Sequence, residues 1–135
     1  MGGSWQGGRR EDYVFVAEAL AARGFMSVIP DYRVYPEVRF PAFIEDGASA
    51  VAWVCSNTNR IGDDAARLFL MGHSAGAYIA AMLALNSSYL AQGGMTTREL
   101  KGFVGMAGPY DFLPLKSPNL IKTSMVRMAS LRLSQ

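Results

Sequence analysis

One serine stands in a pattern typical of a catalytic nucleophile. Ser74 is at the centre of Gly72-His73-Ser74-Ala75-Gly76, between the apolar run that ends at Met71 and an alanine-rich stretch. In a Gly-x-Ser-x-Gly pattern the serine occupies a sharp strand-to-helix turn, where flanking glycines let the helix pack closely and leave the hydroxyl exposed. Such a hydroxyl can attack the carbonyl carbon of an ester or amide. The strand-turn-helix context favours this nucleophile elbow over a glycine-rich turn with an idle serine.

Acyl transfer also needs hydrogen-bond donors for the oxyanion that forms during attack. The backbone N–H of Ala75, at the start of the expected helix, is one candidate donor, and the helix dipole would assist it. Gly3 and Ser4, in Gly2-Gly3-Ser4-Trp5, are candidates for a second set, because glycines let the main chain approach a substrate closely. The alternative for this segment is a flexible N-terminal tail.

A serine nucleophile further needs a base and an orienting acid, and here the sequence is deficient. His73 is the only histidine of the chain. A residue adjacent to the nucleophile points away from its hydroxyl, so we expect His73 to pack or hydrogen-bond beside the elbow rather than accept the proton. Asp111 is a candidate acid, although an aspartate after Gly-Pro-Tyr more often forms a turn. Asp31 and Arg33 are expected to form a structural turn and an ion pair.

The remaining polar residues do not suggest a metal or cofactor site. Cys55 is the only cysteine, which excludes an internal disulfide, and we interpret it as a buried structural thiol. No cluster of cysteine and histidine is present to hold a metal, so we predict neither a metal nor a cofactor.

The elements that must position these residues alternate between helices and short apolar strands. This alternation predicts an α/β fold with a parallel sheet and right-handed crossovers. Residues 86 to 98 are expected to be a polar connection. The apolar spacing predicts helices over Arg9–Arg23, Pro41–Cys55 and Gly76–Leu85, and strands over Phe25–Ile29, Arg67–Met71 and Gly102–Ala107.

Composition narrows the class of protein. The chain has 135 residues, of which 50% are hydrophobic and 18% charged, enough for one domain with a modest core. A net charge of +2 is too balanced for a nucleic-acid surface. No signal-peptide pattern and no run of 18 apolar residues occurs, so we expect no membrane span and a cytoplasmic location.

Several motifs together resemble the α/β-hydrolase superfamily. They occur in the order Gly2-Gly-Ser-Trp5, Pro30-Asp-Tyr-Arg33, Tyr35-Pro-Glu37, Phe40-Pro41 and Gly72-His-Ser-Ala-Gly76. More narrowly, the chain is similar to carboxylesterases with His-Gly-Gly-x-Trp and Gly-x-Ser-x-Gly motifs, the group of hormone-sensitive-lipase-like and kynurenine-formamidase-like esterases. This resemblance implies that Ser74 is the nucleophile and that Gly3, Ser4 and Ala75 supply the oxyanion-hole amides. Met1 stands where the family has histidine.

The resemblance also implies an incomplete fold. The family carries its acid and histidine on loops after later strands, whereas only 61 residues follow Ser74 (135 minus 74). It further implies a three-layer α/β/α arrangement whose mostly parallel sheet lacks N-terminal and C-terminal strands here. The family's third strand would end just before Met1 and would separate the strands at Met26–Ile29 and Leu68–Met71. We therefore expect a fragment with unpaired strand edges, through which copies of the chain could associate.

Residues 1–115 are accordingly expected to form a partial α/β-hydrolase core, with an unmatched tail over residues 116–135 that could form a basic helix. The leading hypothesis is a serine hydrolase of small-molecule carboxylic esters that is inactive as this piece because the base is missing. The alternatives are a non-catalytic ligand-binding or interaction module on a hydrolase-like fold, and an enzyme whose histidine comes from a partner chain.

Overall fold

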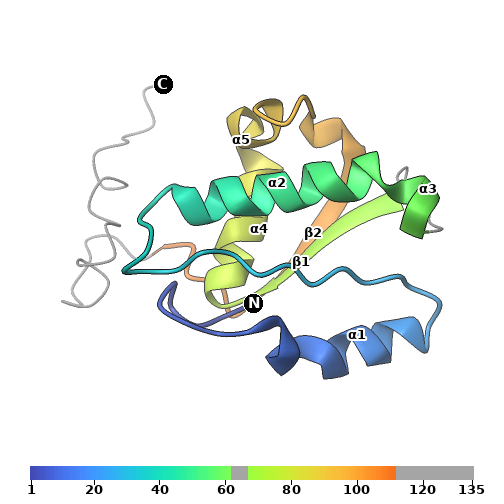
Figure 1. Ribbon diagram of the computed structural model, residues 1–135, viewed down its shortest axis with the longest axis horizontal. Coiled ribbons are helices and arrows are strands. Elements are labelled where there is room, and N and C mark those ends of the chain that lie inside the picture. The colour runs from blue at the N-terminus through green and yellow to red at the C-terminus, as the bar shows by residue number, and fades with distance from the viewer. Residues whose placement is uncertain (62–66, 112–135) are drawn as a thin grey trace.

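The computed structural model describes residues 1–61 and 67–111 (Figure 1). In this part of the chain helices precede the first of two strands and separate it from the second, so the predicted strand-helix-strand alternation occurs once. The elements are η1 (Arg10–Tyr13), α1 (Val14–Ala21), α2 (Ala42–Ser56), α3 (Thr58–Ile61), β1 (Leu68–His73), α4 (Ala75–Leu85), α5 (Ser87–Ala91), η3 (Thr97–Glu99) and β2 (Leu100–Met106).

The two strands form a parallel sheet. Phe69 of β1 lies opposite Gly102 of β2, and His73 lies opposite Met106, with one irregularity in register next to Leu68. Because parallel strands need a crossover, the α4 helix and the segment after it connect the end of β1 to the start of β2. This arrangement confirms the predicted α/β class and two of the three predicted strands.

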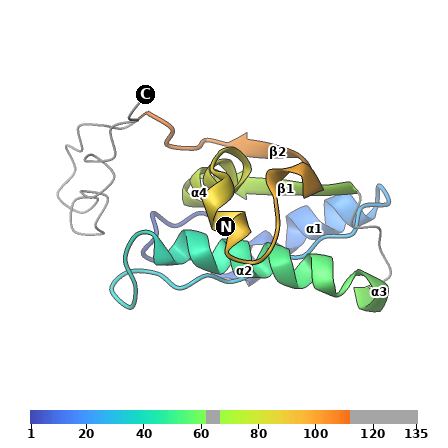
Figure 2. The ribbon, with the colours of Figure 1, turned by 90° about the horizontal axis from the view of Figure 1, so that it is seen from above.

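Helix α4 covers one face of the sheet, and α2 packs on the other side of α4 (Figure 2). All but three of the residues of α4 are buried, because the helix lies between two apolar layers. Its alanines keep the helix thin enough for this close packing. The core cluster consists of Trp5, Phe43, Ile44, Ala48, Val51, Ala75, Tyr78, Ile79, Leu83, Tyr89, Leu90 and Met95.

The opposite face of the sheet is apolar and exposed. Phe69 and Met71 of β1 are 57% and 46% exposed, and Val104 and Met106 of β2 are 51% and 37% exposed. The side chains of a strand alternate between its two faces, so these four residues share the face away from α4. We call these four residues the open face.

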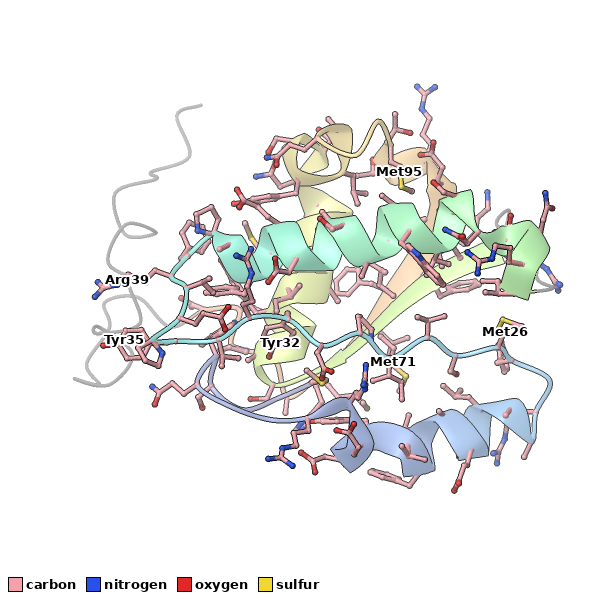
Figure 3. The ribbon with its side chains drawn as sticks, viewed as in Figure 1. Met26, Tyr32, Tyr35, Arg39, Met71 and Met95 are labelled. Carbon is pink, nitrogen blue, oxygen red and sulfur yellow. The ribbon has the colours of Figure 1, made fainter. Side chains whose placement is uncertain are left out.

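The prediction of a strand over Phe25–Ile29 was wrong. These residues are extended but belong to no sheet, and in the described part of the chain β1 pairs with β2 alone. A strand is defined by its hydrogen-bonded neighbour, and no described segment supplies one beside Phe25–Ile29. Met26, on this segment, is 48% exposed, much like Met71 of β1 (Figure 3).

The predicted polar connection over residues 86 to 98 was also wrong in part, since it contains α5 and η3. The side chain of Asn86 accepts a hydrogen bond from the Ser88 N–H and begins α5. Thr96 and Glu99 form a capping box at η3, in which each side chain bonds the other residue's backbone.

The two longer helices before β1 lie where the sequence places them. The predicted helix over Arg9–Arg23 is observed as η1 and α1, and it ends at Gly24, whose φ is 81°. Helix α1 contains no buried residue, whereas α2 buries Phe43 and Ile44. The predicted unmatched tail, residues 116–135, lies outside the described residues.

Candidate active site

Ser74 forms the turn between β1 and α4. Its φ of 51° and ψ of −118° lie in a region that non-glycine residues rarely adopt. The surrounding backbone holds this conformation: the Ser74 N–H donates to the Met106 carbonyl at 2.8 Å, and the Ser74 carbonyl accepts from Ala77 and Tyr78. The strained strand-to-helix turn that the sequence predicts is therefore present, and it is attached to the end of β2.

The two elbow glycines are required by close backbone contacts. A Cβ on Gly72 would collide with the backbone of Gly76 and Ala77, so no other residue lets α4 approach β1 this closely. A Cβ on Gly76 would collide with the backbone of Met1. Gly76 thus leaves room for the N-terminal segment, which lies directly on the start of α4.

The N-terminal segment is a built loop and not a free tail. Gly3, Ser4 and Trp5 have φ values of 124°, 52° and 57°, and the Gln6 N–H donates to the Gly3 carbonyl at 2.9 Å, which closes a tight turn. The Trp5 side chain anchors this turn and is only 3% exposed. Its ring meets Tyr78 edge-on at 5.7 Å and Phe43 at 5.9 Å.

The loop reaches the turn at Ser74. A Cβ built on Gly2 would lie 3.2 Å from the Cβ of Ser74 and 2.9 Å from Nδ1 of His73. The structure therefore brings the Gly2–Ser4 segment and Ser74 together, although residues 2 and 74 are far apart in sequence. Among the described residues, the N–H groups of Gly3, Ser4 and Ala75 have no hydrogen-bond partner and can donate to a bound ligand.

Two tyrosines at this site were missed by the sequence analysis. The Gly2 N–H donates to the hydroxyl of Tyr13 at 2.7 Å, and that hydroxyl is 3.1 Å from Nδ1 of His73. The hydroxyl of Tyr32 donates to the Met1 carbonyl at 3.2 Å. No motif marks Tyr13. Tyr32 stands inside the Asp-Tyr-Arg motif, but only the two charged residues of that motif suggested an interaction.

His73 has the hydrogen-bonding role that the sequence predicts. Its Nδ1 is paired with Tyr13, and in the described part of the chain the Ser74 hydroxyl has no hydrogen-bond partner. Asp111, the candidate acid, is exposed and makes no hydrogen bond to another described residue. The site therefore combines a strained serine with free amide donors but without a base beside the hydroxyl.

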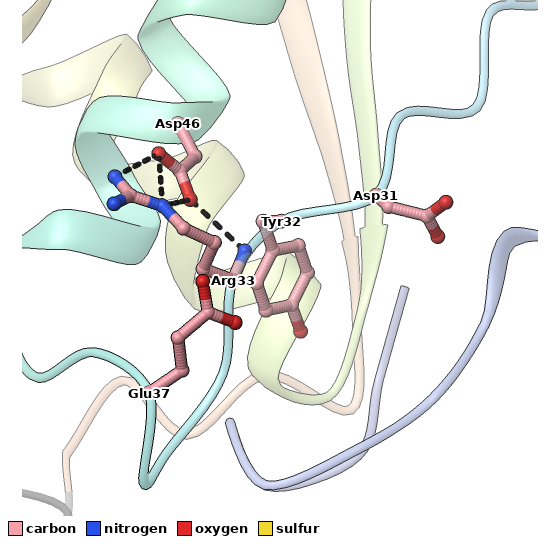
Figure 4. A pocket seen from close by; sticks show the side chains of 5 residues that line it. All are labelled: Asp31, Tyr32, Arg33, Glu37 and Asp46. Atoms are coloured by element: carbon pink, nitrogen blue, oxygen red, sulfur yellow. Dashed lines mark hydrogen bonds and ion pairs between the residues drawn. The ribbon is translucent and has the colours of Figure 1, made fainter.

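The expected ion pair between Asp31 and Arg33 was wrong. Arg33 instead pairs with Asp46 of α2 at 2.7 Å, and its backbone N–H and Nε also donate to that carboxylate (Figure 4). Asp31 pairs with Arg10, with Nε and carboxylate oxygen 3.4 Å apart. Asp31 and Arg33 lie on either side of Tyr32 in the sequence, and each pairs with a residue of another element rather than with the other (Figure 4).

The Arg33–Asp46 pair fixes the segment that carries Tyr32 onto α2. Partial burial raises the pKa of Asp46, but the hydrogen bonds and charge of Arg33 outweigh it and hold that pKa below its usual range. Burial raises the pKa of Tyr32 to about 12, so its hydroxyl stays protonated as a donor to the Met1 carbonyl. The shallow hollow in Figure 4 is lined by Asp31, Tyr32, Arg33, Glu37 and Asp46.

Other kinds of site find little support in the described residues. Within residues 1–61 and 67–111, no group of histidine, cysteine, aspartate and glutamate could hold a metal ion. Cys55 is half-buried against the core, and burial raises the pKa of its thiol, which makes the thiolate less available. None of the helices described is long and apolar enough to cross a bilayer.

Comparison with known proteins decides the family. The model of the BD-FAE family matches residues 1–133. The chain belongs to the BD-FAE family. This finding agrees with the α/β-hydrolase resemblance that the motifs suggest.

Two curated relatives of this BD-FAE chain are esterases. A probable isoprenylcysteine alpha-carbonyl methylesterase of Oryza sativa subsp. japonica is 33% identical over 119 residues, which are 84% of this chain and 28% of the relative. The esterase LipC of Mycobacterium tuberculosis is 33% identical over 125 residues, which are 87% of this chain and 30% of the relative. The chain therefore spans less than a third of each relative's length and is homologous to carboxylesterases over that part.

A solved structure from a study of two fungal esterases of Rhizomucor miehei matches the fold. The TM-score is 0.68 at 28% sequence identity, and the match covers 90% of this chain and 36% of the solved one. The two parallel strands with their packed helices are thus part of a larger esterase fold in that protein.

Proposed function

We propose that the chain carries the nucleophile and the oxyanion hole of a serine hydrolase that acts on small-molecule carboxylic esters. The observation that carries this proposal is the strained backbone of Ser74, at φ 51°, with the Gly2–Ser4 loop in contact with it. Homology to carboxylesterases supports the same reaction class.

The chemistry assigns a part to each group. Oγ of Ser74 attacks the ester carbonyl carbon, and the carbonyl oxygen becomes an oxyanion that accepts hydrogen bonds from the N–H groups of Ala75, Gly3 and Ser4. Collapse of this intermediate breaks the bond to the alcohol and leaves an acyl group on Ser74. The proton of Oγ must pass to the departing alkoxide, and water then releases the acid.

The lack of a base limits the rate of ester cleavage by Ser74. The only histidine is engaged with Tyr13, so within these 135 residues no imidazole accepts the proton of Ser74. Enzymes stripped of a triad member retain roughly 10³- to 10⁴-fold acceleration over water from the oxyanion hole and binding. We therefore propose that these residues alone act slowly or not at all, and that Asp111 does not serve as the acid.

A second candidate is a non-catalytic binding module, which is favoured because no base lies beside Ser74 among residues 1–61 and 67–111. The net charge of +2 does not favour nucleic acid as a ligand, whether the chain is a hydrolase or a binding module. We further propose a cytoplasmic location, and self-association through the edge of β1 that no described segment pairs with. This strand carries no lysine or proline to discourage strand pairing.

A fluorophosphonate probe and a p-nitrophenyl ester test the proposal. Wild-type chain is compared with Ser74→Ala and with Ser87→Ala, a control that removes an exposed hydroxyl at the start of α5. Slow labelling that is lost in Ser74→Ala alone supports the hydrolase. Equal or absent labelling in all three chains supports the binding module. Brisk turnover that depends on Ser74 would contradict the assignment of a missing base.

A further inference from the structure

One peptide unit beside the nucleophile is held from both sides. The Gly2 N–H donates to the hydroxyl of Tyr13 at 2.7 Å, and the Met1 carbonyl, on the other side of the same peptide bond, accepts from the hydroxyl of Tyr32 at 3.2 Å. Tyr13 ends η1, and Tyr32 belongs to the extended segment after α1. Each end of the peptide dipole therefore has its own partner.

The Gly2 N–H can only donate, so the Tyr13 oxygen accepts from it. The same oxygen lies 3.1 Å from Nδ1 of His73, and the tautomer of His73 decides which of the two groups donates. A continuous chain of hydrogen bonds then leads from the loop through Tyr13 to the last residue of β1, immediately before Ser74.

Tyr32 supplies the opposite contact and is itself held in place. A carbonyl can only accept, so the Tyr32 hydroxyl must donate, and burial keeps it protonated. The next residue, Arg33, binds Asp46 of α2 through its side chain and backbone. The Met1–Gly2 peptide is thus connected to α2 on one side and to β1 on the other.

We infer that Tyr13 and Tyr32 are positioning residues, which clamp the Met1–Gly2 peptide and so place the Gly3 and Ser4 amides against the nucleophile turn. This inference rests on the proposed function for its catalytic consequence, but the clamp can be measured without it. Gly3 follows the clamped peptide directly, and its φ of 124° allows the sharp change of direction that leaves its amide free.

Amide hydrogen exchange followed by NMR tests the clamp in the full chain. The variants are Tyr13→Phe and Tyr32→Phe, which remove only the hydroxyls, and the control is Tyr35→Phe. Tyr35 holds the loop through its backbone N–H, which donates to the Trp5 carbonyl at 2.8 Å, so loss of its hydroxyl leaves that contact unchanged. Amides of α4 report global unfolding, and those of residues 2 to 5 report the loop.

Loss of one such hydrogen bond should raise the exchange of the Gly2 amide in Tyr13→Phe about 3- to 10-fold, with the α4 amides unchanged. Tyr32→Phe should raise exchange across residues 2 to 5 by a smaller factor, and Tyr35→Phe should match the wild type. Unchanged exchange at Gly2 in Tyr13→Phe would overturn the clamp, and so would equal acceleration in the loop and in α4.

The catalytic part has its own readout. Where wild type shows turnover that Ser74→Ala abolishes, Tyr13→Phe should lower kcat about 10-fold and leave KM within 2-fold, because the amides act on the oxyanion and not on the bound ester. A change in KM alone would refute the positioning role. Absence of any Ser74-dependent turnover would count against the proposed function, while the exchange data would still decide the clamp.

Discussion

A methyl group added at Gly72 should destabilise the whole domain, whereas the same change at Gly7 should not. The Cβ of Gly72→Ala would meet three backbone atoms of Gly76 and Ala77 closer than 3.0 Å, and backbone cannot turn aside as a side chain can. Overpacking of this kind costs about 1 to 3 kcal/mol, and contacts this short with backbone atoms put the cost at the upper end of that range. Up to about 1 kcal/mol is offset because alanine suits a strand interior better than glycine. We expect a net loss of about 2 kcal/mol in the free energy of unfolding.

Urea unfolding and thermal melts followed by circular dichroism measure this effect. For a domain of this size about 2 kcal/mol corresponds to a fall in Tm on the order of 8 °C. Gly7→Ala is the matched control, because nothing lies within 4 Å of its Cβ and its φ is not positive. It should leave the Tm unchanged or raise it slightly. A Gly72→Ala variant as stable as Gly7→Ala would refute the close approach of β1 and α4.

Three further predictions concern the turn at Ser74, the ion pair and the edge of β1. Ser74→Gly should raise the free energy of unfolding, measured in urea, by about 1 kcal/mol, because glycine adopts φ 51° without strain. The same variant should lose labelling by the probe. A variant less stable than wild type would contradict backbone strain at Ser74. Arg33→Gln should lower the free energy of unfolding at pH 7 only slightly, because the guanidinium is exposed and solvent screens the pair. Folding lowers the pKa of Asp46, so the pair stabilises the fold above the usual aspartate pKa of about 3.9, and this stabilisation is lost as the pH falls through the folded pKa. If urea unfolding shows the same stability difference between wild type and Arg33→Gln at pH 7 and at pH 2, this account is refuted. Met71→Lys, which puts a lysine on β1, should reduce self-association in sedimentation velocity. Ser87→Lys, with the same charge on α5, should not, and equal behaviour of the two variants would exclude β1 as the contact.

Local signals in the sequence were sufficient for the elements that pack around Ser74. The apolar run before Gly72 and the alanines after Gly76 identify β1 and α4, because periodicity and glycine spacing act over a few residues. The capping box at Thr96 and Glu99 carried an equally local signal for η3, which the prediction of a polar connection overlooked.

Long-range contacts were not predictable in the same way. The hydrogen bond from Gly2 to Tyr13 joins residues 11 apart, and that from Tyr32 to Met1 joins residues 31 apart. Pairing of Arg33 with Asp46 depends on how α2 docks against the extended segment. Composition also suggested a strand over Phe25–Ile29, but a strand exists only where a second segment completes its hydrogen bonds, which propensity does not determine.

The Ser74 N–H is bonded to the carbonyl of Met106, 32 residues further along the chain (106 minus 74). The unfavourable torsion of the serine therefore depends on a segment that leaves the ribosome later. Until β2 has been synthesised and has docked, β1 and α4 can form locally, but the turn between them is free to relax to an ordinary conformation. The strained conformation of Ser74 is thus expected to form late in folding, after β2 has paired with β1.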